Sequence, residues 1–124
     1  MEIRALKHAW SGIRPRLKGV CLVYLFGSRV QGNLGPASDY DIAALADRDV
    51  DEQALLARLA HELSLALNTD QVDVVSLNRA PIELPYAIIA QGKLLYERDV
   101  ATRVDYEAKI LGLYGDLLPM LRAV

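Results

Sequence analysis

The chain has 124 residues, 52% of them hydrophobic and 24% charged, a composition typical of one globular domain and too short for a catalytic domain plus a substrate domain. Its apolar runs are too short to span a bilayer and its N-terminus lacks the apolar stretch of a secretory signal, so we expect no membrane segment and a cytoplasmic location. Fourteen basic and sixteen acidic side chains give a net charge of −2, which argues against a nucleic acid as the direct substrate.

The N-terminal third predicts a helix and two strands. An amphipathic helix is expected over residues 3–13, where apolar side chains recur at helical spacing before Pro15 stops the pattern. Residues 20–26 are apolar and largely β-favouring, which indicates a strand buried on both faces. Residues 29–38 predict a short helical turn and a loop, and residues 39–45 predict a second strand with its polar residues at its entrance.

The middle of the chain predicts a second helix and a third strand. Asp49, with Glu52 three residues later, resembles a capping box and predicts a helix that ends near Asn68. One face of this helix carries five leucines: Leu55, Leu56, Leu59, Leu63 and Leu67. The third strand is expected over residues 71–77, which are apolar except for Asp73 and the ends.

The C-terminal part predicts two helices separated by a strand. Pro81 can occupy the first turn of a short helix that closes at Gly92, and Pro85 either kinks that helix or also lies in its first turn. Residues 93–97 predict a short edge strand, and a final helix is expected over about residues 100–123. Seven apolar residues make this helix amphipathic: Val104, Ile110, Leu111, Tyr114, Leu117, Leu118 and Leu121. Tyr114 and the leucines are expected to be core residues first of all, and part of the helix could still form a partner surface.

The order of the elements predicts the fold class. Helix, strand, strand, helix, strand, helix, strand and helix indicate an α/β (α+β) fold in which a small mixed sheet is flanked by helices. No repeat, low-complexity tract or linker divides the sequence. We therefore expect a single domain over residues 1–124, with a central part over about residues 20–97.

The residues that point to chemistry form an ordered set. Gly27 and Ser28 follow a buried strand, where backbone N–H groups and a hydroxyl suit phosphate oxygens. Asp39 and Asp41 come after ten intervening residues and point to one face of a strand, because side chains alternate along it. Asp73 interrupts the next apolar strand, where an unpaired carboxylate would be costly to bury. Three such carboxylates would repel one another and raise at least one pKa. Magnesium is a natural ion for them to bind, because it takes oxygen ligands.

Each of these residues also has an ordinary structural explanation. Gly27 and Ser28 alone could form a strand-ending turn, Asp39 and Asp41 a solvated loop or helix cap, and Asp73 a solvent-facing position on an edge strand. Their combination favours a site. Asn33 and Leu34 stand where a P-loop needs Lys and Ser or Thr, so that motif is excluded. The remaining candidates are expected to be structural or at the surface: Cys21, His8 and His61.

The spacing from Gly27-Ser28 to Asp39-x-Asp41, with Ser38 directly before Asp39 and with the later Asp73, resembles the DNA polymerase β-type nucleotidyltransferase superfamily. The small size and residues 72–75 resemble its minimal, MNT-type branch. The resemblance implies one or two Mg²⁺ ions, ATP as substrate, and a nucleotidyltransferase fold. It implies metal-binding and catalytic roles for the three aspartates. It also implies nucleotide binding by four residues: Gly27, Ser28, Arg29 and Ser38.

For this branch the resemblance also implies a partner. The chain would be the antitoxin of a HEPN-domain toxin, would transfer AMP to a tyrosine hydroxyl of that toxin, and could form a hetero-oligomer with it. Many members carry a basic residue where this chain has Gln31, which leaves Arg29 to do more at the phosphates.

Two other functions stay open at the level of sequence. The chain could neutralise its partner by occlusion, binding nucleotide with little transfer, or it could transfer a nucleotide to a small molecule such as an antibiotic. Asp73 could ligate metal, act as general base, or do both. The acceptor, the preferred base, the number of metals and the oligomeric state are likewise open.

Overall fold

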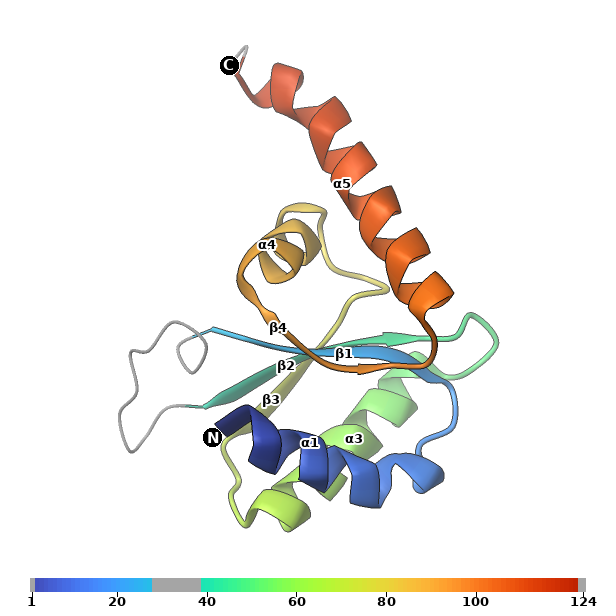
Figure 1. Ribbon diagram of the computed structural model, residues 1–124, viewed down its shortest axis with the longest axis vertical. Coiled ribbons are helices and arrows are strands. Elements are labelled where there is room, and N and C mark those ends of the chain that lie inside the picture. The colour runs from blue at the N-terminus through green and yellow to red at the C-terminus, as the bar shows by residue number, and fades with distance from the viewer. Residues whose placement is uncertain (1, 28–38, 123–124) are drawn as a thin grey trace.

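A four-stranded sheet with helices on both faces forms the body of the protein (Figure 1), as the computed structural model describes it for residues 2–27 and 39–122. The elements in chain order are α1 (Glu2–Ile13), the 3₁₀ helix η1 (Arg14–Arg16), β1 (Val20–Phe26), β2 (Tyr40–Ala46), α3 (Glu52–Leu67), β3 (Val72–Ser76), α4 (Glu83–Gln91), β4 (Lys93–Glu97) and α5 (Val100–Arg122). The strands lie in the order β3-β2-β1-β4. β1 is antiparallel to β2 and β4, whereas β2 and β3 are parallel. The predicted fold class and order of elements are confirmed.

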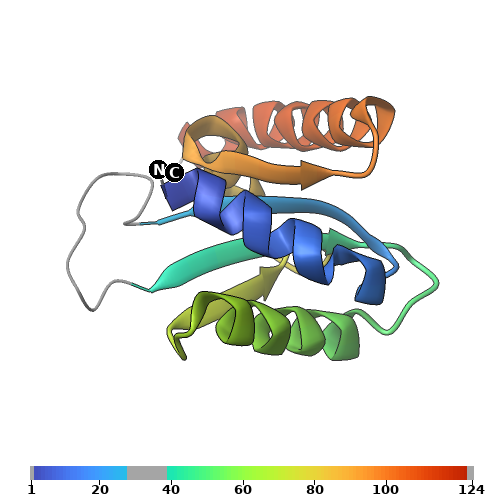
Figure 2. The same ribbon diagram turned by 60° about the horizontal axis from the view of Figure 1, so that its bottom comes forward.

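The two faces of the sheet are covered by different helix pairs. Helices α1 and α3 lie on one face, and α4 and α5 lie on the other (Figure 2). Because side chains alternate along a strand, each strand contributes to both layers. On the α1 and α3 side, Val23 and Ile42 pack with the buried leucines of α3, and on the other side Tyr24 and Ala43 pack with Ile88 of α4. β1 is thus buried on both faces, as predicted.

The start of α3 differs from the sequence prediction. Asp51, not Asp49, caps the helix, and its carboxylate accepts a hydrogen bond from the Ala54 N–H at 3.2 Å. Glu52 is the first helical residue, and its carboxylate instead accepts hydrogen bonds from Ser76 and Arg79. The predicted capping box is therefore wrong, because the Glu52 side chain bonds to the last residue of β3 and to Arg79 beyond it rather than to its own helix terminus.

Helix α4 begins later than predicted. Pro81 precedes it, and the Pro81 carbonyl accepts a hydrogen bond from the Leu84 N–H at 3.1 Å. Pro85 lies in the first turn, where its missing N–H costs no helical hydrogen bond. The helix ends at Gly92 as predicted, with the Gly92 N–H donating to the Ile88 carbonyl at 2.7 Å.

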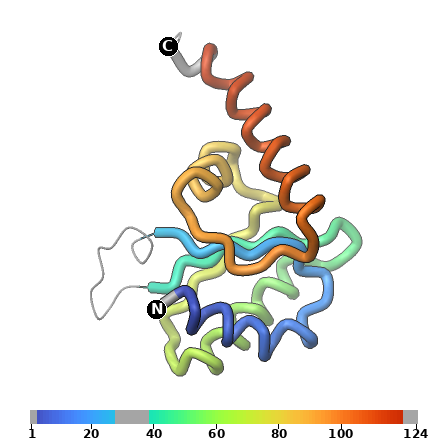
Figure 3. Tube along the Cα trace, in the orientation of Figure 1, coloured from blue at the N-terminus to red at the C-terminus, as the bar shows by residue number. Residues whose placement is uncertain are grey.

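Helix α5 is only partly a core helix. Near its start, Tyr24 of β1 donates a hydrogen bond to Glu107 at 2.7 Å, and further along, Tyr114 stacks on Tyr86 of α4 at 3.7 Å between ring centroids. Ile110 is buried, but Val104 and Leu111 are 48% and 47% exposed. Figure 3 shows that the C-terminal half of α5 extends past α4 and away from the sheet. The expectation that Tyr114 and the leucines of this helix are first of all core residues is wrong for Leu111 and Leu113, which are 47% and 48% exposed.

Two further predictions concern the loop after β1 and the expected lack of a membrane segment. The helical turn and loop expected over residues 29–38 lie outside the part of the chain that the structure describes. Within residues 2–27 and 39–122, no helix is both long and apolar enough to cross a membrane.

Candidate active site

One row of backbone partners crosses three strands at the edge where β1 ends and β2 begins, at the left of Figure 1. Phe26 of β1 pairs with Asp41 of β2, and Asp41 pairs with Asp73 of β3. Asp73 comes to Asp41 because β2 and β3 are parallel and both begin at this edge. Asp39 lies just before β2, two residues from Asp41. Asp73, which is distant in sequence, therefore meets Asp39 and Asp41 at one end of the sheet.

Asp41 and Asp73 point toward the face that α4 and α5 cover. Ala43 and Val75, two residues beyond Asp41 and Asp73, belong to the apolar layer beneath α4. Because side chains two residues apart along a strand share a face, Asp41 and Asp73 point the same way. Phe26 belongs to that layer as well. The shared face predicted for Asp39 and Asp41 stays a prediction, because Asp39 lies outside β2.

Gly27 lies against Asp41 in a way that only glycine allows. Its φ is +79°, a left-handed conformation that side chains disfavour. A Cβ atom built at Gly27 would lie 2.2 Å from Asp41 Oδ2 and 3.0 Å from its Cγ. The glycine at the end of β1 thus leaves the room that the Asp41 carboxylate occupies.

The aspartates differ in exposure. Asp39 and Asp73 are exposed, whereas Asp41 is partly buried between β1 and β3. Burial raises the pKa of Asp41 above its usual value, and the neighbouring charges of Asp73 and Asp39 raise it further. The predicted rise of one pKa is confirmed, with burial as the larger cause. Asp73 itself is not buried, so the expected cost of burying it does not arise, and its position on an edge strand matches the solvent-facing alternative.

The acidic set suits a magnesium ion that is also bound by its substrate. Within residues 2–27 and 39–122, no group of three or more His, Cys, Asp or Glu side chains is arranged as a ready metal site. Mg²⁺ commonly takes only one or two protein carboxylates and completes its shell with waters and substrate phosphates. Burial raises the pKa of Asp41 and the charges of Asp73 and Asp39 raise it further, so a cation bound there would relieve the repulsion among the three carboxylates. The donor chemistry therefore fits Mg²⁺ bound together with a triphosphate.

Four residues of interest cannot be placed. Ser28, Arg29, Gln31 and Ser38 lie outside the described residues. Of the predicted nucleotide-binding residues, only Gly27 is positioned, at the end of β1 beside Asp41. The nucleotide-binding role of the other three stays a prediction.

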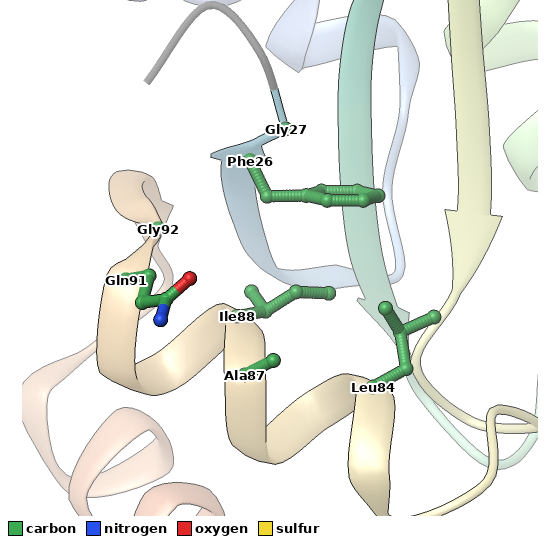
Figure 4. A pocket seen from close by; sticks show the side chains of 7 residues that line it. All are labelled: Phe26, Gly27, Leu84, Ala87, Ile88, Gln91 and Gly92. Atoms are coloured by element: carbon green, nitrogen blue, oxygen red, sulfur yellow. The ribbon is translucent and has the colours of Figure 1, made fainter. Parts of the chain in front are cut away.

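A small apolar pocket next to Gly27 was not predicted from the sequence. We call it the Phe26 slot; it has a volume of about 120 Å³ and lies between the end of β1 and α4 (Figure 4). The slot is lined by Phe26, Gly27, Leu84, Ala87, Ile88, Gln91 and Gly92. Figure 4 shows Leu84 and Ile88 of α4 pointing toward the Phe26 ring. The helix was expected from the sequence, but nothing in the sequence indicated which strand end it would face.

Cys21 is buried, as predicted, at the opposite end of β1. Its S–H donates to Asp47 Oδ1 at 3.0 Å, and Arg98 forms two hydrogen bonds to the same carboxylate. Burial, followed by the Asp47 hydrogen bond, raises the pKa of the Cys21 thiol to about 12. A thiol with so high a pKa forms little thiolate, so Cys21 is a structural residue. His8 and His61 are exposed on their helices, in line with a surface role.

Comparison with known proteins identifies the family. The model of the polymerase β nucleotidyltransferase family matches residues 13–101, which include β1, the aspartates and α4. The chain belongs to this family. The family and class of enzyme predicted from the aspartate spacing are thereby confirmed, and the sheet described above is the nucleotidyltransferase fold.

Individual relatives agree with the family assignment. The chain is 40% identical over 115 residues to the protein adenylyltransferase MntA of Shewanella oneidensis, which covers 90% of this chain and 78% of that protein. It is similar to a chain in a crystal structure of a toxin–antitoxin with AMP-PNP, with a TM-score of 0.75, 29% identity, and coverage of 99% and 94% of the two chains. A structure of a tri-AMPylated Shewanella oneidensis HEPN toxin in complex with MNT antitoxin gives a TM-score of 0.73, 28% identity and coverage of 99% and 94%.

The stability of this nucleotidyltransferase should depend on pH through Asp41. Its folded pKa lies above its unfolded value, so its favourable contribution is complete below the unfolded pKa and is lost as pH rises through the folded pKa. Urea unfolding in EDTA between about pH 3.5 and 7 should therefore show Asp41→Asn gaining stability relative to the unmodified chain as pH rises. A constant difference between the two proteins across this range would contradict the prediction.

Proposed function

We propose that this chain transfers AMP from ATP to a tyrosine hydroxyl of a HEPN-domain toxin, in a magnesium-dependent reaction, and that it thereby acts as the antitoxin. The observation that carries the proposal is the row that sets Asp41 between Asp73 and the Phe26 end of β1. The similarity to MntA and to antitoxins crystallised with toxin or AMP-PNP supports the reaction and the partner. We place the reaction in the cytoplasm, where ATP is available.

The nucleotide would be held from the β1 side of Asp41. The backbone N–H groups of Gly27 and Ser28 would donate hydrogen bonds to phosphate oxygens, with Arg29 and Ser38 as further contacts. Gly27 brings its backbone close to the Asp41 carboxylate, which would place the phosphates beside the acidic residues.

Asp39 and Asp41 would hold magnesium together with the triphosphate. The bound ion supplies positive charge against the phosphate oxygens and the departing pyrophosphate. Partial burial of Asp41 strengthens its electrostatic interaction with a cation, because the effective dielectric constant is lower there than in water.

Asp73 would serve the acceptor. It is exposed on the edge strand β3, on the far side of Asp41 from Gly27, where a hydroxyl from another protein has open access. There its carboxylate could orient the acceptor hydroxyl and take its proton, or ligate the metal, and both roles stay open. The similarity to a structure of an AMPylated HEPN toxin in complex with its antitoxin favours a protein acceptor over a small molecule, and a hetero-oligomer of the two chains.

The proposal is tested by label transfer. The chain is incubated with its HEPN-domain partner, MgCl₂ and ATP labelled on the α-phosphate, and the partner is then digested and its peptides analysed by mass spectrometry. We expect label on a tyrosine of the partner and its loss when EDTA replaces magnesium. An unlabelled partner with every nucleoside triphosphate would overturn the proposed reaction.

Neutralisation by occlusion is the competing function, and the exposed Leu111 and Leu113 of α5 offer it an apolar contact surface. Asp39→Asn distinguishes the two functions, because Asp39 is exposed outside the strand and its replacement should leave the fold intact. We expect the variant to lose both transfer and neutralisation in a toxicity assay. A variant that neutralises the toxin without labelling it would show occlusion instead.

A further inference from the structure

We propose that a groove along the outer edge of β3 binds the segment of the partner protein that carries the acceptor hydroxyl, and that this segment pairs with β3 as an added strand. This inference rests on the proposed function, since it places the acceptor of the same reaction. We call the feature the α3–β3 groove, because it lies between these two elements, which run side by side (Figure 2). It has a volume of about 380 Å³, and its lining includes Leu56, Ala57 and Ala60 of α3 and Val72, Asp73 and Val74 of β3.

The groove reaches the candidate active site through Asp73. This residue lines the groove and is also the backbone partner of Asp41. In the strand order β3-β2-β1-β4, the groove lies on the opposite side of Asp41 from Gly27, where the phosphates would bind. A chain in the groove can therefore reach the acidic residues without displacing the nucleotide.

β3 offers an open edge for an added strand. It is the outermost strand of the sheet, and within residues 2–27 and 39–122 no other strand pairs with its outer side. An unpaired strand edge is a template for pairing with another chain, and lysine or proline on the edge commonly prevents it. β3 contains neither of these residues. Addition of an extended segment to such an edge is a common mode of peptide recognition.

The hydrogen bonds between β2 and β3 show which backbone groups face outward. The Gln71 carbonyl, just before β3, accepts a hydrogen bond from the Tyr40 N–H of β2 at 2.8 Å. Successive residues of a strand direct their backbone groups to opposite edges, so the odd-numbered residues of β3 face β2. The residues that direct their N–H and C=O groups to the outer edge are Val72, Val74 and Ser76.

The alternation of side chains predicts the pattern of the acceptor segment. A residue directly opposite Asp73 on an added strand would share the face of Asp73 and Asp41, so a tyrosine there carries its hydroxyl on the side of the aspartates. Its two neighbours would point to the other face, where Val72 and Val74 pack with the buried leucines of α3. The groove wall from α3 is apolar there. We therefore expect the acceptor tyrosine to lie between two apolar residues in an extended segment.

Charge argues against a second copy of this chain as the occupant. Homodimers usually form about a two-fold axis, in which the same surface of each copy meets the other. Two β3 edges paired in this way would bring the Asp73 carboxylates of both copies close together, and like charges across paired strands are destabilising. A partner segment without an acidic residue at this position avoids that repulsion.

Two matched substitutions on α3 test the inference. Ala57→Trp places a large side chain in the groove, whereas Ala66→Trp makes the same change at an exposed α3 position that does not line it. Label transfer is measured over a range of HEPN-toxin concentrations at saturating MgATP, and MgATP binding is measured by calorimetry. We expect Ala57→Trp to raise the KM for the toxin about tenfold or more with unchanged MgATP affinity, and Ala66→Trp to behave like the unmodified chain.

Backbone pairing has a separate measurement. Amide hydrogen exchange of the unmodified chain is followed by NMR with and without the toxin, in EDTA and without ATP. We expect the outward-facing N–H groups of Val72 and Val74 to exchange more slowly when the toxin is bound. A raised KM in Ala57→Trp without this protection would overturn the added strand.

The other outcomes separate this inference from the proposed function. A normal KM for the toxin in Ala57→Trp would overturn the acceptor groove and leave the proposed function standing, and so would a raised KM that Ala66→Trp shares or a weaker MgATP affinity in Ala57→Trp. A dimer of this chain in sedimentation that Ala57→Trp dissociates would assign the edge to a second copy instead. Absence of label on the toxin with the unmodified chain would overturn both.

Discussion

Replacement of Asp41 by asparagine is expected to abolish nucleotide transfer while making the metal-free protein more stable. Asparagine has nearly the shape of aspartate but no charge, so it removes a negative group that is partly buried beside Asp73 and Asp39. A group aimed at charge that develops in a transition state contributes roughly 10²–10³-fold to rate. We therefore expect transfer to fall by at least about that factor in a quantitative label-transfer assay.

Measurement of the free energy of unfolding serves as the control for the Asp41→Asn variant. Urea unfolding at pH 7 in EDTA should show a higher free energy of unfolding for Asp41→Asn, so lost activity could not be attributed to misfolding. Asp105→Asn makes the same change at an exposed position on α5 and should alter neither quantity. An active Asp41→Asn protein would remove Asp41 from the site, and a less stable one would contradict the cost of burial and the repulsion that together raise the pKa of Asp41.

Replacement of Gly27 by alanine is expected to disrupt the site from the backbone side. The left-handed φ of +79° costs a residue with a side chain about 1–2 kcal/mol. The new Cβ would also lie 2.2 Å from Asp41 Oδ2 and 3.2 Å from Asp41 Cβ, so the whole Asp41 side chain must shift. We expect lower stability and a loss of MgATP affinity of about tenfold or more in calorimetry.

Gly112→Ala is the matched control for this substitution. Gly112 lies within α5, and a Cβ there would meet no atom within 4 Å. Alanine in place of an unconstrained helical glycine stabilises a protein by roughly 0.5–1 kcal/mol. Gly112→Ala should therefore unfold at a higher urea concentration and bind MgATP normally. Normal MgATP binding by Gly27→Ala would show that the contact between Gly27 and Asp41 has no part in the site.

Local sequence patterns were sufficient for most of the secondary structure. β1 was predictable because its apolar run has no polar interruption, and the end of α3 at Asn68 because asparagine adopts the left-handed conformation that closes a helix. The start of α3 was not predictable, because Asp49 and Asp51 are both good capping residues. Only the packing of Glu52 against Ser76 and Arg79 determines that Asp51 is the cap.

The sequence by itself determined the family and the acidic residues of the candidate site, because the spacing from Gly27 to Asp41 and the alternation of side chains along a strand are local properties. The tertiary structure decided which strands became neighbours, and so placed Asp73 beside Asp41. It also created the Phe26 slot from a strand end and a helix about sixty residues apart, and left the outer half of α5 without a sheet to cover. These features depend on long-range packing, which no local pattern in the sequence encodes.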